Sequence, residues 1–510
     1  MEKPPASQRA TAFTPRNKIG FFLGLALFFL LLPLDLDPTN PAIPRILAVA
    51  ALMAAWWITE AIPIPVTSLL PLVLFPVLGI MDAKKVAPIY MNSNIFLFMG
   101  GFILALAIEK WGLHRRIALN VIRLLGVRPR RLVLGFMIAT AFLSLWISNT
   151  ATTMLMLPIA LSVIRRMEKA MGGREESVFP VALMISIAYA ASIGGTGTLI
   201  GTPPNISFTR ILAISFPEAP EISFGVWFAM AFPLVIVFLG LSWMLLTTVL
   251  FPLGKENVEG AREVLLAERN ELGRMSREER IVLVLFVLTA LLWICRADIR
   301  FGGTVLAGWA SRLGLEGVDD STVAMFTAIL LFLIPAKRAK GRLMDWETAV
   351  RLPWGILLLF GGGFALASGF KETGLTSWIG EKFLPLAGTS PKLLVLATSS
   401  LLTFLTEVTS NTATTEMILP LLASIAVSLH IHPLLLMIPA TLSASCAFML
   451  PVATPPNAIV FGSGRVPIQT MAKAGILMNI LGIILIFLTL FTLGTFLFGI
   501  TPDALPAWAH

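Results

Sequence analysis

Charged side chains are scarce in this chain of 510 residues. Asp, Glu, Lys and Arg make up only 13% of it, against about 25% in ordinary soluble domains. Apolar residues make up 56%, and runs near the ~20 residues needed to cross a bilayer recur from end to end. The longest polar stretch, residues 254–280, is too short to bury a core of its own. The composition excludes a soluble protein and predicts an all-α polytopic membrane protein.

Motifs for catalysis and nucleotide binding are also missing. The chain has no His-Glu-x-x-His, no Gly-x-Ser-x-Gly and no Walker A sequence. These absences argue against an intramembrane enzyme and against a nucleotide-driven pump, so we expect no enzymatic activity and no cofactor. The two cysteines lie in apolar sequence and indicate no disulfide framework. The net charge of +9 reflects basic cytoplasmic loops and not a nucleic-acid partner.

Two apolar segments do not read as simple crossings. Residues 131–166 and 392–429 each hold two short apolar arms around a polar centre. An arm of about 16 helical residues spans about 24 Å, less than the ~30 Å hydrocarbon core, so each segment predicts a re-entrant hairpin. We expect about eleven further segments to cross the membrane, with the fifth and tenth interrupted: 19–34, 45–61, 64–80, 93–112, 178–213, 223–251, 281–296, 321–336, 353–371, 434–462 and 474–499.

Basic residues indicate how these segments are oriented. No clear cleavage site follows the first apolar run, so we interpret it as a retained span. Positive charge accumulates on the cytoplasmic side of membrane proteins. We therefore expect a multi-pass protein of the cytoplasmic membrane, with its N-terminus inside, its C-terminus outside and its hairpins entering from opposite faces. Most of the 38 Lys and Arg residues lie in the N-terminal tail and in loops near 114–131, 165–174, 255–280, 337–351 and 465–473.

An internal repeat connects the two hairpins. Ser148-Asn-Thr-Ala-Thr-Thr153 recurs as Ser410-Asn-Thr-Ala-Thr-Thr415, and Phe98-Met-Gly-Gly-Phe102 recurs as Phe360-Gly-Gly-Gly-Phe364 at the same spacing. Further downstream, a Thr-Pro-Pro-Asn sequence starts at Thr202 and again at Thr454. In the expected topology the two copies run in opposite directions through the membrane. Inverted repeats with interrupted helices are typical of transporters that bind their substrate near the midplane.

The repeated motifs carry chemistry suited to ions. Irregular backbone at membrane depth survives only inside protein or beside a water-filled cavity. At each hairpin tip one half-helix ends in free carbonyls, which suit a small hard cation, and the next begins with free N–H groups, which suit an anion. One turn before the tips lie two more hydroxyls, Ser144 and Thr406, on the same helix faces as Ser148 and Ser410. Neither motif contains Lys or Arg, so we expect co-bound cations to neutralise an anionic substrate.

In combination these motifs resemble the divalent anion:sodium symporter (DASS) family of di- and tricarboxylate and sulfate carriers, over nearly the whole chain. The resemblance implies two sodium sites, the first at Ser144, Ser148, Asn149 and Gly201 and the second at Thr406, Ser410, Asn411 and Ala453. It also implies a set of residues that contact the substrate: Ser148, Asn149, Thr150, Thr202, Ser410, Asn411, Thr412, Thr454 and Pro455.

The same resemblance implies a homodimeric elevator carrier, in which a transport domain moves against a scaffold. We expect a cytoplasmic tail at 1–18, scaffold helices and the start of the first repeat at 19–130, and a transport-domain hairpin with an interrupted helix at 131–222. The sixth span, a cytoplasmic loop and scaffold helices of the second repeat follow at 223–390, and a second hairpin, interrupted helix and last span at 391–510.

Two alternatives to Na⁺-coupled entry of dicarboxylate or tricarboxylate anions stay open on the sequence alone. One is an Na⁺-independent dicarboxylate exchanger, and the other is a sulfate carrier of the same fold. Succinate and citrate are among the candidate substrates. Two intramembrane acids, Glu407 and Glu416, have no acidic counterparts in the first repeat, and we expect them to make polar contacts near the outer surface.

Overall fold

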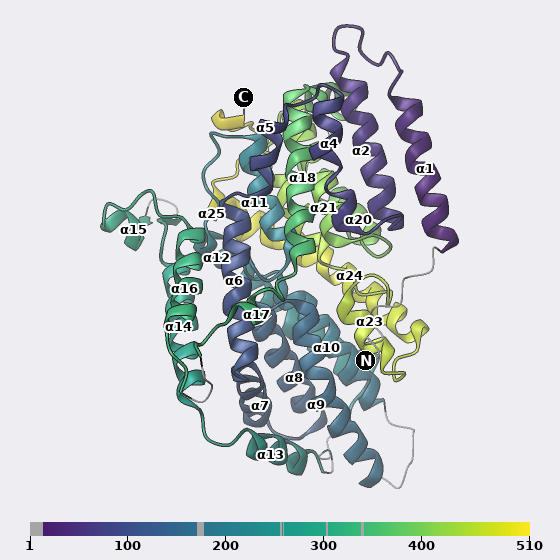
Figure 1. The fold of residues 1–510 in the computed structure, drawn as a ribbon. Coiled ribbons are helices and arrows are strands. Elements are labelled where there is room, and N and C mark those ends of the chain that lie inside the picture. The colour runs from purple at the N-terminus through teal and green to yellow at the C-terminus, as the bar shows by residue number, and fades with distance from the viewer. Residues whose placement is uncertain are drawn as a thin grey trace, which may run out of the picture.

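The computed structural model describes residues 14–170, 178–254, 258, 260–301, 304–337 and 341–509. It is built almost entirely of helices, stacked along one long axis (Figure 1). Helix α1 (Pro15–Leu31) begins at a capping box in which the side chains and backbones of Thr14 and Asn17 satisfy one another. Most of the predicted cytoplasmic tail at 1–18, namely residues 1–13, lies outside the described residues.

Two matching series of helices follow the sequence repeat. The first series consists of α6 (Ser93–Lys110), α7 (Leu113–Leu125), α8 (Pro129–Ser144), α9 (Asn149–Ala170), α10 (Phe179–Gly195), α11 (Pro203–Ser215) and α12 (Phe224–Met244), which continues as η3 (Leu245–Leu250). The second consists of α18 (Trp354–Glu372), α19 (Leu375–Lys382), α20 (Pro391–Leu405), α21 (Asn411–Ser428), α22 (Leu434–Ala444), α23 (Pro455–Gly462) and α24 (Ile468–Thr489), which continues as η5 (Leu490–Gly494).

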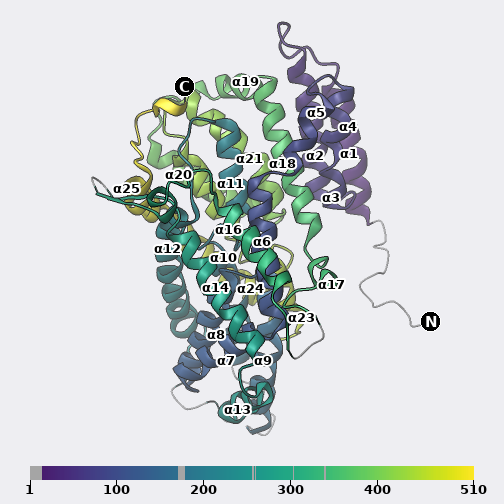
Figure 2. The ribbon, with the colours of Figure 1, turned by 60° about the vertical axis from the view of Figure 1, so that its left-hand side comes forward.

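The two series are related in detail. Gly112 before α7 and Gly374 before α19 both adopt left-handed backbone, with φ of 72° and 71°. The rings of Phe98 and Phe360, which occupy equivalent repeat positions, contact each other edge to face with centroids 5.1 Å apart. Helix α7 lies towards one end of the molecule and α19 at the other (Figure 2). The repeat is therefore visible in backbone geometry as well as in sequence.

The remaining elements precede, separate and follow the two series. Helices α2 (Ala42–Thr59), α3 (Ile64–Thr67), α4 (Leu70–Val77), α5 (Ala83–Val86) and η2 (Ala87–Tyr90) come first. Between the series lie α13 (Ala261–Leu272), α14 (Arg277–Ile294), α15 (Trp309–Arg312), α16 (Asp320–Leu333) and α17 (Trp346–Ala349). Strands β1 (Ile299–Phe301) and β2 (Thr304–Leu306) pair antiparallel there, with Ile299 opposite Leu306. A short helix, η4 (Leu384–Leu386), lies between α19 and α20 within the second series. After that series come α25 (Thr495–Phe498) and η6 (Ala507–Ala509).

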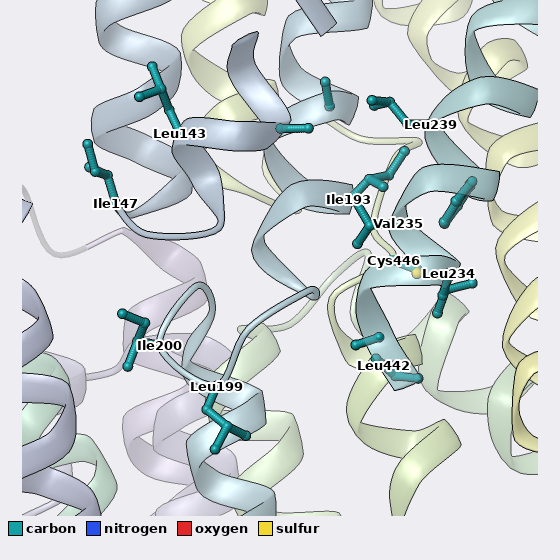
Figure 3. Packing of buried hydrophobic residues seen from close by; sticks show 14 of the residues in the cluster. Leu143, Ile147, Ile193, Leu199, Ile200, Leu234, Val235, Leu239, Leu442 and Cys446 are labelled. Carbon is teal, nitrogen blue, oxygen red and sulfur yellow. The ribbon is translucent and has the colours of Figure 1, made fainter. Parts of the chain in front are cut away.

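Buried apolar side chains form two separate clusters. The smaller one joins α1, α2 and α4 to one face of α18, and the larger one holds most of the two repeat series. Around the helix breaks, side chains of α12 such as Val235 lie near Ile193 of α10 and Cys446 after α22 (Figure 3). Helix α18 contributes to both clusters, through Phe360 and Phe364 on one side and Leu366 and Phe370 on the other.

Several sequence-based expectations need correction. In the described part of the chain, five helices are long and apolar enough to cross a membrane by length and composition, and several shorter apolar helices accompany them. The expected eleven crossings are therefore not confirmed as such, because breaks divide apolar segments into pieces shorter than a bilayer. The described residues also include a short antiparallel pair of strands, β1 and β2, that the all-α expectation omits.

The segments expected to be basic loops at 114–131 and 255–280 are largely helical, as α7 and α13. Two of their arginines form ion pairs: Arg116 Nε lies 3.0 Å from Glu279 Oε1, and Arg115 Nη2 lies 2.8 Å from Glu271 Oε2 and also contacts Glu268. A count of Lys and Arg alone misses such pairing, because the acidic partners lie far away in sequence.

Candidate functional site

The repeated motifs meet around one cavity of about 850 Å³, which we call the central cavity. The hairpin tips between α8 and α9 and between α20 and α21 face it, together with the breaks between α10 and α11 and between α22 and α23. All of the residues expected to contact substrate line this cavity: Ser148, Asn149, Thr150, Thr202, Ser410, Asn411, Thr412, Thr454 and Pro455.

Four helices begin at the central cavity, namely α9, α11, α21 and α23. Each presents the positive end of its dipole to the cavity, which favours an anion. Helices α11 and α23 start with two prolines each, so their first positions lack N–H groups. Helices α9 and α21 begin with Asn-Thr and retain their N–H donors, and Ser148 Oγ and Ser410 Oγ accept from Ala151 N and Ala413 N at 3.2 and 3.5 Å. Any hydrogen bonds from helix N-termini to an anion therefore come mainly from α9 and α21.

Behind the first hairpin tip, three oxygen atoms converge, forming what we call the first oxygen cluster. Ser144 Oγ lies 2.5 Å from Asn149 Oδ1 and 2.7 Å from the carbonyl oxygen of Ala191 in α10. A hydroxyl supplies one hydrogen and the other two oxygens supply none. At most one of these two close contacts is a hydrogen bond, and such an oxygen-rich, hydrogen-poor arrangement suits a small hard cation.

The second hairpin repeats this arrangement as the second oxygen cluster. Thr406 Oγ1 lies 2.6 Å from Asn411 Oδ1 and 2.9 Å from the carbonyl oxygen of Ala444 in α22. Residues expected at the two sodium sites are therefore brought together in both repeats, and the Ala191 and Ala444 carbonyls join them. The sequence does not identify those two carbonyls, because every residue type carries a main-chain oxygen.

Gly201 and Ala453, the backbone positions expected at the sodium sites, both line the central cavity. A Cβ atom at Gly201 would lie 2.5 Å from the carbonyl oxygen of Gly195 and 3.0 Å from that of Ser144. The absence of a side chain therefore lets this stretch pack directly on carbonyl oxygens beside the first oxygen cluster. In the second repeat the equivalent residue is alanine, and the clusters differ in their immediate packing.

The asparagine of each Thr-Pro-Pro-Asn sequence ties its helix break together. Asn205 Nδ2 donates to the carbonyl oxygens of Thr198 at 2.7 Å and Gly195 at 3.4 Å. Asn457 Nδ2 donates in the same way to those of Leu450 and Ala447, both at 3.1 Å. These bonds satisfy carbonyls that the break frees from the helix, so both asparagines brace the site from behind.

Glu407 has an internal role and not the outer-surface contact expected from sequence. Its side chain is buried, Oε1 accepts from the N–H groups of Phe448 and Met449 at 2.8 and 2.9 Å, and Oε2 accepts from that of Leu450 at 3.0 Å. Asn479 Nδ2 also donates to Oε1 at 2.8 Å. The carboxylate therefore anchors the unwound stretch after α22 to the second hairpin. Sequence could not foresee this, because three of the four donors are backbone groups and the fourth, Asn479, lies 72 residues away.

Other residues at the central cavity also escaped the sequence analysis. Phe98 and Phe102 provide an apolar wall, and Arg16 from α1 lines the cavity while its Nη2 donates to the carbonyl of Ile58 at 2.6 Å. From sequence, Arg16 belongs to the N-terminal tail, and only the packing of α1 against α2 brings it to the cavity. The repeated motifs themselves contribute no basic side chain.

A cavity enclosed by the ends of broken helices, within a chain of membrane-spanning apolar helices, defines a membrane transporter. Two solved transporter structures share the fold: that of Alcanivorax borkumensis YdaH (TM-score 0.58, 15% identity, 94% of this chain and 99% of that one) and that of Neisseria gonorrhoeae MtrF (TM-score 0.55, 12% identity, 86% and 87%).

The transmembrane region of the sodium:sulfate symporters matches residues 19–500, and the chain belongs to this family. Similar relatives are two proteins named sodium-dependent dicarboxylate transporter SdcS. The one from Staphylococcus saprophyticus is 46% identical over 482 residues, covering 93% of this chain and 91% of that protein. The one from Staphylococcus aureus strain MRSA252 is 45% identical over 504 residues, covering 97% and 94%.

Proposed function

We propose that this protein is a secondary carrier that moves dicarboxylate anions across the cytoplasmic membrane together with Na⁺. The observation that carries the proposal is the pair of oxygen clusters directly behind the tips that line the central cavity. Each cluster offers oxygens to a cation, while four helix N-termini offer positive dipoles to an anion. Anion and cation then neutralise one another in a site whose repeated motifs contain no basic residue.

The relatives named for sodium-dependent dicarboxylate transport favour this substrate class over sulfate or a tricarboxylate such as citrate. The duplicated oxygen clusters favour Na⁺ coupling over an Na⁺-independent exchanger, because exchange of one dicarboxylate for another requires no cation site. Succinate is the simplest dicarboxylate with which to test both points.

Uptake into proteoliposomes tests the proposal. An inward Na⁺ gradient should drive accumulation of radiolabelled succinate well above the level reached with K⁺ in place of Na⁺, and excess unlabelled sulfate should compete poorly. Vesicles without protein serve as the control. Counterflow of succinate that proceeds equally well without Na⁺ on either side would support the exchanger, and strong competition by sulfate would support a sulfate carrier.

We further propose an elevator mechanism in a homodimer, with the N-terminus inside the cell and the C-terminus outside. The moving unit comprises residues 131–222 and 391–510, and the rest is the scaffold. Glycines of α6 and α18 support this division. A Cβ at Gly100 or Gly362 would press on scaffold residues Ala324 or Ser68, whereas at Gly101 or Gly363 it would press on Ile200 or Glu416 of the moving unit. Each pair forms a smooth surface between scaffold and moving unit.

Cysteine labelling tests the movement. Val408 lines the central cavity at the second hairpin tip and is 55% exposed, so Val408→Cys, in a background of Cys295→Ser and Cys446→Ala, offers one reactive thiol. It should react with a membrane-impermeant maleimide from opposite faces under different Na⁺ and substrate conditions. Lys84→Cys, on the exposed scaffold helix α5, should react from the outer face only. Labelling of Val408→Cys from a single face under every condition would contradict the elevator.

A further inference from the structure

Glu416 is a buried acid outside both the central cavity and the oxygen clusters. It lies on α21, one turn after Thr412, and its side chain is fully buried. Its carboxyl contacts Ser207 of α11 through Oε1, and Oε2 lies where a Cβ of Gly363 on α18 would be. It therefore lies at the contact between the proposed moving unit and the scaffold, and not near the outer surface as the sequence suggested.

The hydrogen bonding around Glu416 fits a neutral carboxyl better than a carboxylate. Ser207 Oγ has two oxygen neighbours, Glu416 Oε1 and the carbonyl oxygen of Pro203 at 3.3 Å. If Glu416 is ionised, the single hydroxyl hydrogen serves the carboxylate and the Pro203 contact has none. If Glu416 is protonated, its O–H donates to Ser207 Oγ and the Ser207 hydroxyl donates to Pro203, so both contacts become hydrogen bonds.

The second carboxyl oxygen points to the same protonation state. Among the described residues, Glu416 Oε2 has no hydrogen-bond partner, although it is buried. A neutral carbonyl oxygen tolerates this position better than a carboxylate does, because half of a carboxylate charge left without a donor is costly in a buried interface.

No charged group on the neighbouring helices compensates Glu416. Within the described residues none forms an ion pair with it, and α22 carries no ionisable side chain. Arg210 of α11 lines a different cavity with Asn94, and the Lys371 ammonium of α18 donates to the carbonyl oxygens of Ile214 and Ser215. The other ionisable groups on the helices packed against α21 are Arg45 on α2, Glu372 on α18, and Glu381 and Lys382 on α19.

We propose that Glu416 is a proton-binding site at the sliding interface, and that it takes up a proton when the moving unit docks against α18 as it does here. This inference rests on the elevator proposed above. One proton from water joins the carboxylate to form a carboxyl, which raises the charge of the moving unit by one and lets the acid pack on Gly363 without a counter-charge. When the unit slides and the acid meets water, the same proton is released. The equivalent position of the first repeat is occupied by Met154, which is exposed. The proposed proton-binding site therefore belongs to the second repeat alone.

The test compares wild type with Glu416→Gln, an isosteric variant that imitates the protonated acid. Na⁺-driven succinate uptake is measured in proteoliposomes with the same pH on both sides, at several pH values. Because the substrate titrates identically for both proteins, their ratio isolates Glu416. Wild-type uptake should fall relative to the variant as pH rises, approaching about tenfold per pH unit where one required proton is lost. Glu372→Gln, at an exposed acid on the scaffold, should follow the wild-type profile.

Infrared difference spectroscopy of the purified protein gives a second readout that needs no transport. A C=O stretching band of a protonated carboxylic acid should be present in wild type at neutral pH and missing from Glu416→Gln. If the variant folds but does not transport, this band alone decides. A constant uptake ratio across pH, or a wild-type spectrum without the band, would overturn the proton site. Loss of Na⁺-driven uptake in wild type at every pH would instead count against the proposed carrier function and leave the infrared result to judge Glu416.

Discussion

Replacing either Asn149 or Asn411 with alanine should abolish transport. Each change removes the Oδ1 atom that lies 2.5 or 2.6 Å from the Ser144 or Thr406 hydroxyl, and with it one oxygen of a cluster. It also removes an amide from the wall of the central cavity. A lost ligand of this kind costs about 1–3 kcal/mol, so the apparent Na⁺ affinity should fall about 5- to 150-fold.

Two measurements separate this effect from misfolding. Succinate uptake should drop to the level of empty vesicles, and the rise in melting temperature on adding Na⁺ should move to higher Na⁺ concentration, because only ligands that prefer the folded state stabilise it. Asn120→Ala, at an exposed position on α7, should behave as wild type. If either cavity variant keeps wild-type uptake and Na⁺ response, its oxygen cluster is not a sodium site.

Gly195→Ala should be almost as damaging, although the change adds only one methyl group. A Cβ at Gly195 would overlap Asn149 Oδ1 and lie 3.0 Å from Nδ2, so the asparagine has to leave the first oxygen cluster. Alanine is otherwise the better helix former by about 1 kcal/mol, so a general weakening of α10 is not the cause. We expect loss of succinate uptake and a weaker Na⁺ response, with the folded protein retained.

Two control variants sharpen this prediction. Gly240 lies in α12, where an added Cβ atom would meet nothing within 4 Å, and Gly240→Ala should leave transport unchanged. Ala447 occupies the position in the second repeat that matches Gly195, since each carbonyl accepts from the bracing asparagine of its own repeat. The second cluster already accommodates a methyl group there, so Ala447→Gly should have only a small effect. Normal Na⁺-driven uptake by Gly195→Ala would show that Asn149 does not need its present position.

Sequence alone predicts the repeated features well, because they depend directly on which residue types stand at these positions. A polar Ser-Asn-Thr sequence inside an apolar segment has to mark a break in the helix, and two consecutive prolines remove N–H groups wherever they stand. Both hairpin tips and both Pro-Pro breaks do meet at the central cavity. The assignment of individual side chains to Na⁺ or substrate stays a prediction that the variants above test.

Features that depend on distant packing could not be predicted in this way. Arg16 reaches the cavity only because α1 packs on α2, and the partners of Glu407 are backbone N–H groups that follow α22 and the side chain of Asn479 in α24. From sequence, the segments that form α7 and α13 are predicted to be basic loops. Nothing in the local sequence shows that Arg116 of α7 pairs with Glu279. In each case the determining neighbour lies tens or hundreds of residues away, where periodicity and composition carry no information.

The two oxygen clusters also impose an order on biosynthesis. The first closes over 47 residues, from Ser144 to Ala191, and the second over 38, from Thr406 to Ala444. The central cavity, in contrast, needs tips and breaks from both halves of the chain. A nascent protein leaving the ribosome can therefore complete its first oxygen cluster before half of the chain has been translated, whereas the central cavity is complete only after α23 has been inserted.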